Sequence, residues 1–517
     1  MLNGKYDICI IGAGVAGALI AALTARSEKK VLLVEAGKRF DFNNRLNQLN
    51  EHLYLNRPLW PWQHPGRDVY EDSSSESLGK DYSLNDLRVK AVGGSTLHWG
   101  GLAQRLYESD FDTFSRYGYG VDWPINYEEL EPYYGLAEVE LGVSGVVNAS
   151  DPYRSSSYPM KGFPHSYDDK GWYDTAKKLG ISLDIVSHAR NSVSYKNRSP
   201  CLSYATCELC PSGAKYSADV HVKEALDSGN CELATESVAR RIRLKDNGDV
   251  DHILVTEIPT GKEHEIVANH YVVAAHAIES ARLLMLSQIG NGSDQLGRNL
   301  MEHWYAGAVG LSKRPTFPNR IAFGTMECNN FYDGAERLER GAIKIEFLNA
   351  SSNPFFLGWW NKLYGNDLND YNCRYFGKAV NVGAEIEHAP NPLSRVTLSD
   401  SKIDMFGDPA PHINFHLTDF DKRTHERAHQ LIESLMEARG LSEIKRTAHY
   451  VEAAHHMGTC RMSDDPASGV VDRNCKLHGS NNLYVCGSSV FPSGGARQPT
   501  LTIAALSIRL AHALLGK

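Results

Sequence analysis

The sequence contains no block of lysine and arginine and no long apolar run, and each absence excludes a class of partner. The chain has 54 Lys and Arg residues and 62 Asp and Glu residues, which gives a formal net charge of −8 over 517 residues. Because a nucleic-acid-binding surface needs clustered positive charge, we expect no nucleic-acid partner. The longest apolar run, near residues 15–25, is shorter than the roughly 20 residues that span a bilayer, so we expect no membrane span.

Cysteine is scarce, and the features of a signal peptide are missing. Ten cysteines in a chain of this length do not make a disulfide scaffold, and only Cys201, Cys207 and Cys210 are clustered. The first residues, MLNGKYDICIIG, enter an apolar strand without a charged segment, an apolar core and a cleavage site. We therefore expect a cytoplasmic protein. The alternative is a periplasmic protein that is exported together with a partner carrying the signal.

The N-terminal 35 residues have the pattern of a dinucleotide-binding βαβ unit. An apolar strand at residues 6–11 runs into Gly12, Gly14 and Gly17, an Ala/Leu-rich helix follows, and a second strand ends at Glu35. In this pattern the first glycine makes the tight turn, the second admits a pyrophosphate and the third lets helix and strand pack closely. The acidic residue accepts hydrogen bonds from ribose hydroxyls. The motif suits FAD at least as well as NAD.

A second glycine-rich segment, residues 88–101, reads RVKAVGGSTLHWGG. Its two glycine pairs would let the backbone lie flat against a large planar ligand. We expect the cofactor to contact Arg88, Gly93, Gly94, Ser95, His98, Trp99 and Gly100.

Near the C-terminus, a histidine pair and a helix start are brought into one stretch. HHMGTC begins at His455, an apolar strand ends in Gly487 and Ser488, and an apolar helix begins at Thr500 directly after a proline. A helix N-terminus offers free N–H groups and a positive dipole end. Beside a histidine able to take a proton, this arrangement suits the oxidation of an alcohol by a flavin. We expect Gly487, Ser488 and Thr500 to contact the cofactor.

Two patterns between these motifs predict secondary structure. The alternating segments 237–258 and 264–274 predict an antiparallel ribbon, and residues 421–439 predict an amphipathic helix that ends at Gly440. The length of the chain predicts two connected domains.

The motifs resemble those of the glucose–methanol–choline (GMC) flavin oxidoreductases. GGSTLHWGG is very close to the first signature of that family. Further likenesses follow in family order: DWPINYEELEPYY (122–134), VVAAHAIESARLLMLS (272–287), LGRNLMEH (296–303), NPLSRVTLS (391–399) and the block that begins at His455. The resemblance spans essentially the whole chain and is nearest to bacterial sugar dehydrogenases and pyranose oxidases.

The resemblance implies an α/β fold in which both domains are discontinuous in sequence. A Rossmann-like FAD-binding domain would join an α+β substrate domain, whose mixed or antiparallel sheet is flanked by helices. We assign residues 1–50, 85–150, 200–310 and 450–517 to the FAD-binding domain, and 51–84, 151–199 and 311–449 to the substrate domain and cover loops.

The resemblance also implies catalytic roles. The family's base occupies the first position of His-x-x-Gly-Thr, here His455, with His456 as a weaker candidate. Its second catalytic position is usually His or Asn, whereas this chain has Gln498, which can donate a hydrogen bond but cannot act as a base. His455 would therefore act as the catalytic base.

Two cofactor questions follow from the same likeness. In some relatives a histidine at the place of His98 is bonded to the flavin, and we favour a non-covalent FAD here. The Cys201, Cys207 and Cys210 loop resembles one that holds an iron–sulfur cluster in a group of glucose dehydrogenases. We favour a loop without metal. An iron–sulfur cluster is the first alternative, and a zinc ion with His221 as its fourth ligand is the second.

We therefore expect FAD-dependent oxidation of a carbohydrate or related alcohol, with hydride transfer to the flavin. A dehydrogenase that passes electrons to an external acceptor or small subunit is preferred over an oxidase. The alternatives are an FAD-containing lyase of the same family and a flavin-binding subunit without activity.

Overall fold

The structure is a computed structural model that describes residues 4–40, 42–55, 72–74, 88–203, 207–317, 324–349, 358, 361–452 and 454–517. A five-stranded parallel sheet forms the centre of one half of it. Its strand order is β19-β11-β1-β2-β7. The strands are β1 (Tyr6–Ile11), β2 (Val31–Val34), β7 (Cys231–Ala234), β11 (Ala268–Val273) and β19 (Leu483–Val485). Segments from both ends of the chain are therefore neighbours in this sheet.

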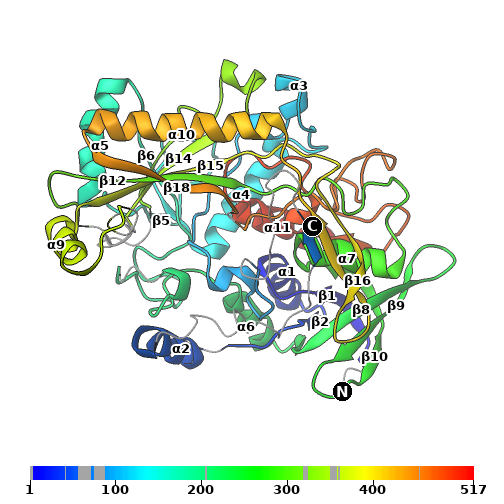
Figure 1. Ribbon diagram of the computed structural model, residues 1–517. Coiled ribbons are helices and arrows are strands. Elements are labelled where there is room, and N and C mark those ends of the chain that lie inside the picture. Colours follow the sequence, from blue (N-terminus) through cyan, green and yellow to red (C-terminus); the bar gives the residue numbers. More distant parts are fainter. Residues whose placement is uncertain are drawn as a thin grey trace.

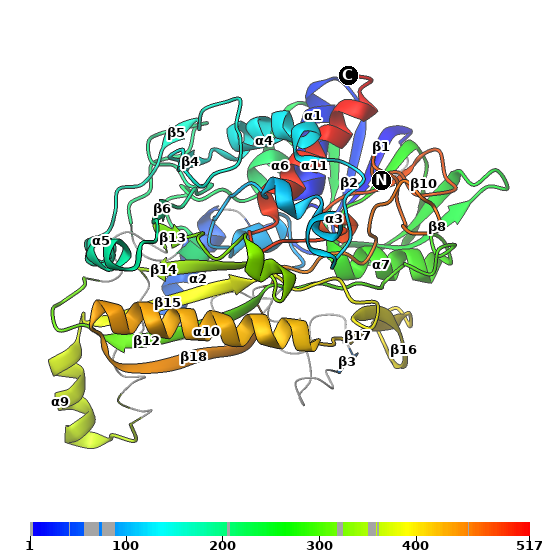
Figure 2. The same cartoon turned by 90° about the horizontal axis from the view of Figure 1, so that it is seen from above.

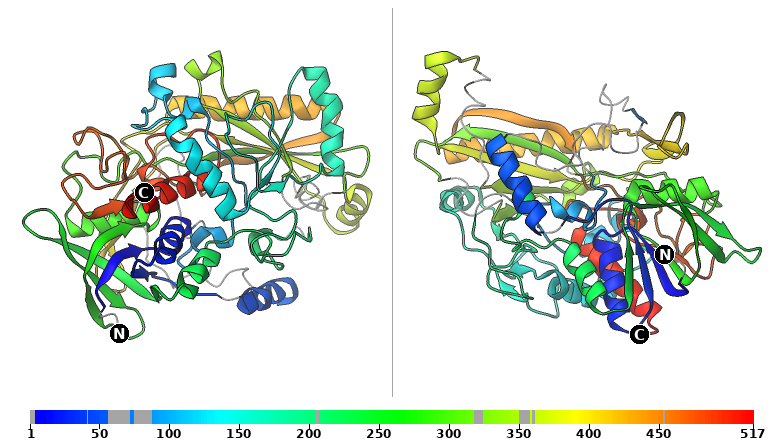
Figure 3. Two further views of the ribbon diagram at one scale, coloured as in Figure 1. Left: turned by 180° about the vertical axis from the view of Figure 1, so that it is seen from behind. Right: turned by 90° about the horizontal axis from the view of Figure 1, so that it is seen from below.

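Helices pack on this sheet, and its central strands β1 and β2 are almost entirely buried. Helix α1 (Val15–Arg26) contacts α6 (Asp219–Asp227) and α11 (Thr500–Leu514), and α11 also contacts α4 (Tyr127–Leu141). Figure 3 shows α11, in red, lying beside the blue N-terminal helix. Almost every residue of α1 is buried, which explains its Ala-rich sequence.

A six-stranded antiparallel sheet forms the other half, in the order β18-β12-β15-β14-β13-β6. Its strands are β6 (Asp184–Ile185), β12 (Trp304–Leu311), β13 (Met326–Cys328), β14 (Ile343–Leu348), β15 (Ala379–Ile386) and β18 (Ser442–Glu452). Helix α10 (Asp419–Arg439) lies along one face of this sheet (Figures 1 and 2). It confirms the helix predicted at residues 421–439, with Gly440 at its C-terminus.

The two faces of the antiparallel sheet differ in chemistry because side chains alternate along each strand. Ile343, Ile345 and Phe347 of β14 join the core beneath α10. The intervening residues Lys344 and Glu346 face the opposite way, and both are buried. The sheet thus has an apolar face toward α10 and a polar face on the other side.

Three smaller sheets complete the fold of the part of the chain that the structure describes. One is the antiparallel ribbon β10-β9-β8, one is β16-β17-β3 and one is β4-β5. Their strands are β3 (Asp72–Ser74), β4 (Ser144–Gly145), β5 (Met160–Lys161), β8 (Ser237–Leu244), β9 (Val250–Glu257), β10 (Glu263–Ile266), β16 (Arg395–Ile403) and β17 (Pro409–Asn414). Among the described residues the remaining α-helices are α2 (Phe42–Leu55), α3 (Thr113–Tyr117), α5 (Tyr167–Leu179), α7 (His276–Ser287) and α9 (Gly365–Tyr375).

The predicted α/β class is confirmed, whereas the ribbon prediction for residues 264–274 is wrong in its second part. Strand β10 does join the ribbon, but β11 pairs in parallel with β1 and β19. Tyr271, Val272 and Val273 are all buried, as a central parallel strand requires. The domain boundaries stay predictions, and residues 56–71 and 75–84 of the predicted cover loops lie outside the described part of the chain. No helix of the described residues is long and apolar enough to cross a membrane.

The close packing of α1 on β1 yields a stability prediction. A Cβ at Gly17 would overlap the backbone oxygen of Gly12, whereas a Cβ at Gly14 would meet no atom within 4 Å. We expect Gly17→Ala to lower the free energy of unfolding by about 1–3 kcal/mol, because the backbone must move. Gly14→Ala, the matched control, should change it by less than about 1 kcal/mol. Urea denaturation of both variants checks this, and equal losses would contradict it.

Candidate active site

One large cavity, with a volume of about 1370 Å³, lies between the two sheets. Its wall on one side is formed by the loops that follow β1, β2, β11 and β19, at the carboxyl edge of the parallel sheet. Open parallel sheets bind their ligands at this edge. The opposite wall comes from the polar face of the antiparallel sheet, through Tyr305, Glu346 and Glu385.

The glycine-rich segments form one end of the cavity. A Cβ at Gly94 would lie 3.1 Å from the Cα of Gly14, so the two loops approach each other backbone to backbone. Glu35, at the end of β2, accepts hydrogen bonds from the N–H groups of Ala13 (2.9 Å) and Gly37 (2.8 Å), which fixes the loop between β1 and α1. Burial raises the pKa of this carboxyl group.

The structure brings nearly all of the residues predicted from the sequence to this cavity. The lining includes Gly12, Gly14, Glu35, Arg88, Gly94, Ser95, His98, Trp99, Gly100, His455, His456, Gly487, Ser488, Gln498 and Thr500. Gly17 and Gly93 are not part of the lining. They support it from behind: Gly17 packs against Gly12, and the N–H of Gly93 donates to the carbonyl oxygen of Ala13 at 2.9 Å.

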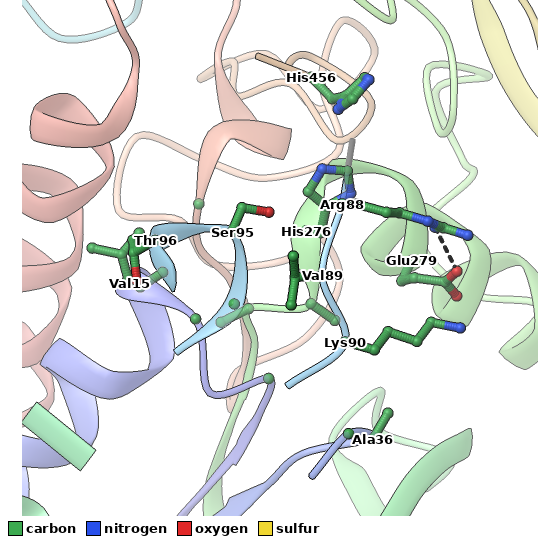
Figure 4. Close-up of a pocket in the computed structure, with 18 of the residues that line it drawn as sticks. Val15, Ala36, Arg88, Val89, Lys90, Ser95, Thr96, His276, Glu279 and His456 are labelled. Carbon is green, nitrogen blue, oxygen red and sulfur yellow. Dashed lines mark hydrogen bonds and ion pairs between the residues drawn. The ribbon is translucent and has the colours of Figure 1, made fainter. Parts of the chain in front are cut away.

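A group of charged side chains lies beside the glycine loops. Arg88 pairs with Glu279 of α7 at 2.8 Å, and Lys90 and His276 line the cavity next to them (Figure 4). Burial and the charge of Arg88 lower the pKa of His276 to about 3. Its ring meets that of His456 edge to face, with centroids 5.1 Å apart. The histidines at this wall are therefore neutral.

The Glu302 carboxylate holds the histidine pair in place. Its Oε1 accepts hydrogen bonds from the backbone N–H groups of His303 and His455, both at 2.7 Å. Its Oε2 lies 3.1 Å from Nε2 of His456. Glu302 is fully buried, so these contacts are shielded from water. Both histidines of the pair are thus tied to the segment that leads into β12.

The side chain of His455 meets that of His303. Their Nδ1 atoms are 3.0 Å apart, and the rings cross edge to face. Glu385 lies close behind, with its oxygens 3.8 Å from Nδ1 of His303 and 4.0 Å from Nδ1 of His455. Burial and the nearby cation of Lys344 lower the pKa of His455 to about 3. His455 is therefore a neutral imidazole at neutral pH, with Nδ1 engaged behind it.

Gln498 is held on three sides by charged groups. Its Oε1 accepts from Lys344 at 2.6 Å, and its Nε2 donates to Glu346 at 2.9 Å and to Glu385 at 2.8 Å. A primary amide has two N–H groups, so both are used. The hydrogen bond to a substrate that the sequence predicted for Gln498 would have to displace one of these carboxylates.

His98 is a buried histidine of the cavity wall. Burial and the charge of Lys215 lower its pKa to about 4. Among the described residues, its Nε2 has no hydrogen-bond partner. A ligand in the cavity could supply one.

The cysteine loop does not form a compact metal site among the described residues. Two groups of possible ligands have their atoms within 4.8 Å of one another, His303/Glu385/His455 and Glu140/His221/Glu224, and neither contains a cysteine. The sulfur atoms instead contact nitrogen donors, with Cys201 near the N–H of Ser203 and Cys210 near that of Lys215. The two ring nitrogens of His221 contact Tyr216 (2.8 Å) and Glu140 (3.2 Å).

Sequence reasoning did not find several residues of the site, among them Glu302, His303, Lys344, Glu346 and Glu385. For Lys344 and Glu346 the available signal was alternation, because IKIEFL places charged residues between apolar ones. That pattern indicates a polar face, but it does not reveal that the face closes a cavity.

Comparison with known proteins identifies related chains along the full length. Two models described as GMC oxidoreductase match residues 6–305 and 390–507. The fructose dehydrogenase large subunit of Gluconobacter japonicus is 30% identical, covering 99% of this chain and 98% of that protein. Paromamine 6′-oxidase of Streptomyces fradiae is 27% identical, covering 99% and 91%.

Solved structures agree in fold. Pyridoxine 4-oxidase from Mesorbium loti superposes with a TM-score of 0.69 at 20% identity, covering 99% of this chain and 100% of that one. Formate oxidase gives a TM-score of 0.71 at 16% identity, covering 100% and 99%.

The contacts of Glu302 yield a second prediction. We expect Glu302→Gln to lower the free energy of unfolding by about 2–4 kcal/mol, because an amide would present an N–H group to donors and leave a buried group unsatisfied. Glu302→Asp, which keeps the charge, is the matched control and should lose less. Thermal and urea unfolding measure the difference. A Glu302→Gln protein as stable as the wild type would contradict this structural role of Glu302.

Proposed function

Because this chain belongs to the GMC oxidoreductase family, we propose that it oxidises a hydroxyl group of a carbohydrate or glycoside to a carbonyl, with His455 as the base. It is an oxidoreductase of CH–OH donors, as the sequence motifs predicted. The observation that carries the residue assignment is the continuous cavity, which joins Glu35 and the glycine loops at one end to His455 at the other.

The residues of the cavity fit FAD, the cofactor of the family. Gly14 and Gly94 leave room for a pyrophosphate, Glu35 is placed to accept from ribose hydroxyls, and the N-terminus of α11 at Thr500 lies in the wall. A polar edge of the ligand would satisfy Nε2 of His98, which has no hydrogen-bond partner among the described residues. Bound FAD supplies the hydride acceptor.

His455 supplies the proton acceptor. Since its Nδ1 faces Nδ1 of His303 at 3.0 Å, the nitrogen left for the substrate is Nε2. In this assignment Nδ1 of His455 carries a proton and donates a hydrogen bond to Nδ1 of His303, which leaves the Nε2 lone pair to accept the hydroxyl proton. His303 is thus a positioning residue that selects the tautomer. The Glu385 carboxylate, 4.0 Å from Nδ1, stabilises the imidazolium that forms.

We propose that electrons leave to an external acceptor and that the protein works with a partner. One relative is named as the large subunit of a fructose dehydrogenase, which supports both points. We further propose non-covalent FAD and no metal in the cysteine loop. Acid precipitation, which would release the yellow colour, and an iron assay test these two statements. Cytoplasmic location stays our expectation from the sequence.

The first functional test is His455→Ala. We expect the variant to bind FAD and to reduce it about 10²- to 10⁴-fold more slowly when substrate is added anaerobically, because the substrate proton has no acceptor. Stopped-flow absorbance measures the rate. His252→Ala, in the three-stranded ribbon, is the control and should reduce FAD at the wild-type rate.

Two results would contradict the proposal. An unchanged rate in His455→Ala would remove the base assignment. A wild-type flavin that stays oxidised with every alcohol and sugar would favour a lyase or an inactive flavin-binding subunit.

The pH profile provides a separate test. Burial and, after it, the nearby cation of Lys344 disfavour the protonated imidazole of His455. The acid limb of kcat/KM should therefore lie below about pH 5 in the wild type, well under the usual histidine value of about 6.5. We expect Lys344→Met to move this limb upward toward pH 6.5, and Lys344→Arg to leave it low. A limb that does not move in Lys344→Met would show that Lys344 does not tune the base.

A further inference from the structure

The substrate end of the cavity carries more buried negative than positive charge. Glu346 and Glu385 both line it, and each is at most 5% exposed. Their cation is Lys344, whose Nζ lies 2.8 Å from Glu346 and 3.3 Å from Glu385. One lysine facing two carboxylates leaves a formal charge of −1.

The surrounding groups do not cancel this excess. Gln498 is neutral, and burial lowers the pKa values of His303 and His455, so both are uncharged. The next ion pairs include Arg497, which lies 3.7 Å from Glu327 and 3.9 Å from Asp151. That second layer adds one positive and two negative charges, so the region remains acidic.

A buried carboxylate without a full counter-charge is strongly unfavourable. The unbalanced charge is removed either when the carboxylate takes up a proton or when a cationic group of the ligand binds to it. Burial raises the pKa values of both Glu346 and Glu385, which agrees with proton uptake when no ligand is bound. A cationic ligand would replace that proton.

An aromatic ring lies beside the two carboxylates. Tyr305 lines the cavity and rests on Gly383, where a Cβ would overlap the phenol ring. An aromatic ring beside hydrogen-bond acceptors suits a sugar, because the ring contacts C–H groups while the carboxylates bind polar substituents.

We propose that the substrate is an amine-bearing carbohydrate, whose ammonium group binds at Glu346 and Glu385 while His455 deprotonates a hydroxyl group of the same molecule. This inference rests on the proposed oxidation of a carbohydrate. The same two carboxylates repel sugar acids, since a carboxylate ligand would bring a further negative charge into a buried acidic region.

The direct experiment compares matched sugars on the wild-type holoenzyme. Neutral hexoses and glycosides, their amino-sugar counterparts and the matching uronic acids are each added anaerobically, and kcat/KM for flavin reduction is measured. We expect the amino sugar to exceed its neutral counterpart by about tenfold or more, with no measurable reduction by the uronic acids. If neutral sugars reduce the flavin and amino sugars are no better, this inference is overturned and the proposed function stands. If no sugar reduces it, both fail.

Variants test which residues set the preference. We expect Glu346→Gln to lower the ratio of kcat/KM for amino sugar over neutral sugar by about tenfold. Glu387→Gln is the matched control, because Glu387 is equally buried and paired with Arg337 at 2.9 Å but does not line the cavity. It should leave the ratio unchanged even if it lowers stability. An unchanged ratio in Glu346→Gln would contradict the assignment.

A test on the unmodified protein covers the case in which Glu346→Gln does not fold. Cyclohexylamine should compete with substrate at least about tenfold more tightly than cyclohexanecarboxylate. Equal inhibition by the two compounds would overturn the inference.

Discussion

The Glu302 carboxylate is the contact on which the geometry of the site depends. It accepts the backbone N–H groups of His303 and His455 and pairs with His456, so one buried group joins the segment before β12 to the loop that carries the histidine pair. Charge-assisted hydrogen bonds of this kind are strong where water is excluded. Because β12 belongs to the antiparallel sheet, these contacts of Glu302 fix the position of the base, His455, relative to both walls of the cavity.

Burial then sets the charge state of that wall. Desolvation disfavours any charged form, so it lowers the pKa of His455 and raises those of Glu346 and Glu385. Lys344 strengthens the first effect and opposes the second. The result is an imidazole that is uncharged at neutral pH, and so has a lone pair to offer to a substrate proton, beside an acidic wall. In our proposal this wall disfavours a substrate with negative charge.

The parts of the fold and site that could be predicted from the sequence are those encoded by neighbouring residues. The turn at Gly12, the packing of Gly17 and the acid at Glu35 follow from one 30-residue pattern, and the structure places them as expected. Helix α10 could be predicted because its apolar face repeats with helical spacing. The ribbon prediction failed at β11 because a strand buried on both faces has no alternation to reveal its partners.

The sequence by itself determined the nucleotide-binding edge, the α/β class and the histidine pair, since each is a local motif whose residue types have a direct steric or chemical reason. Only the tertiary structure decided what surrounds His455. Lys344, Glu346 and Glu385 stand 70 to 111 residues before it in sequence, and they reach it because adjacent antiparallel strands set their side chains on one face. Gln498 shows the same dependence: its identity is plain in the sequence, but its amide hydrogens are engaged by carboxylates that only folding brings within reach.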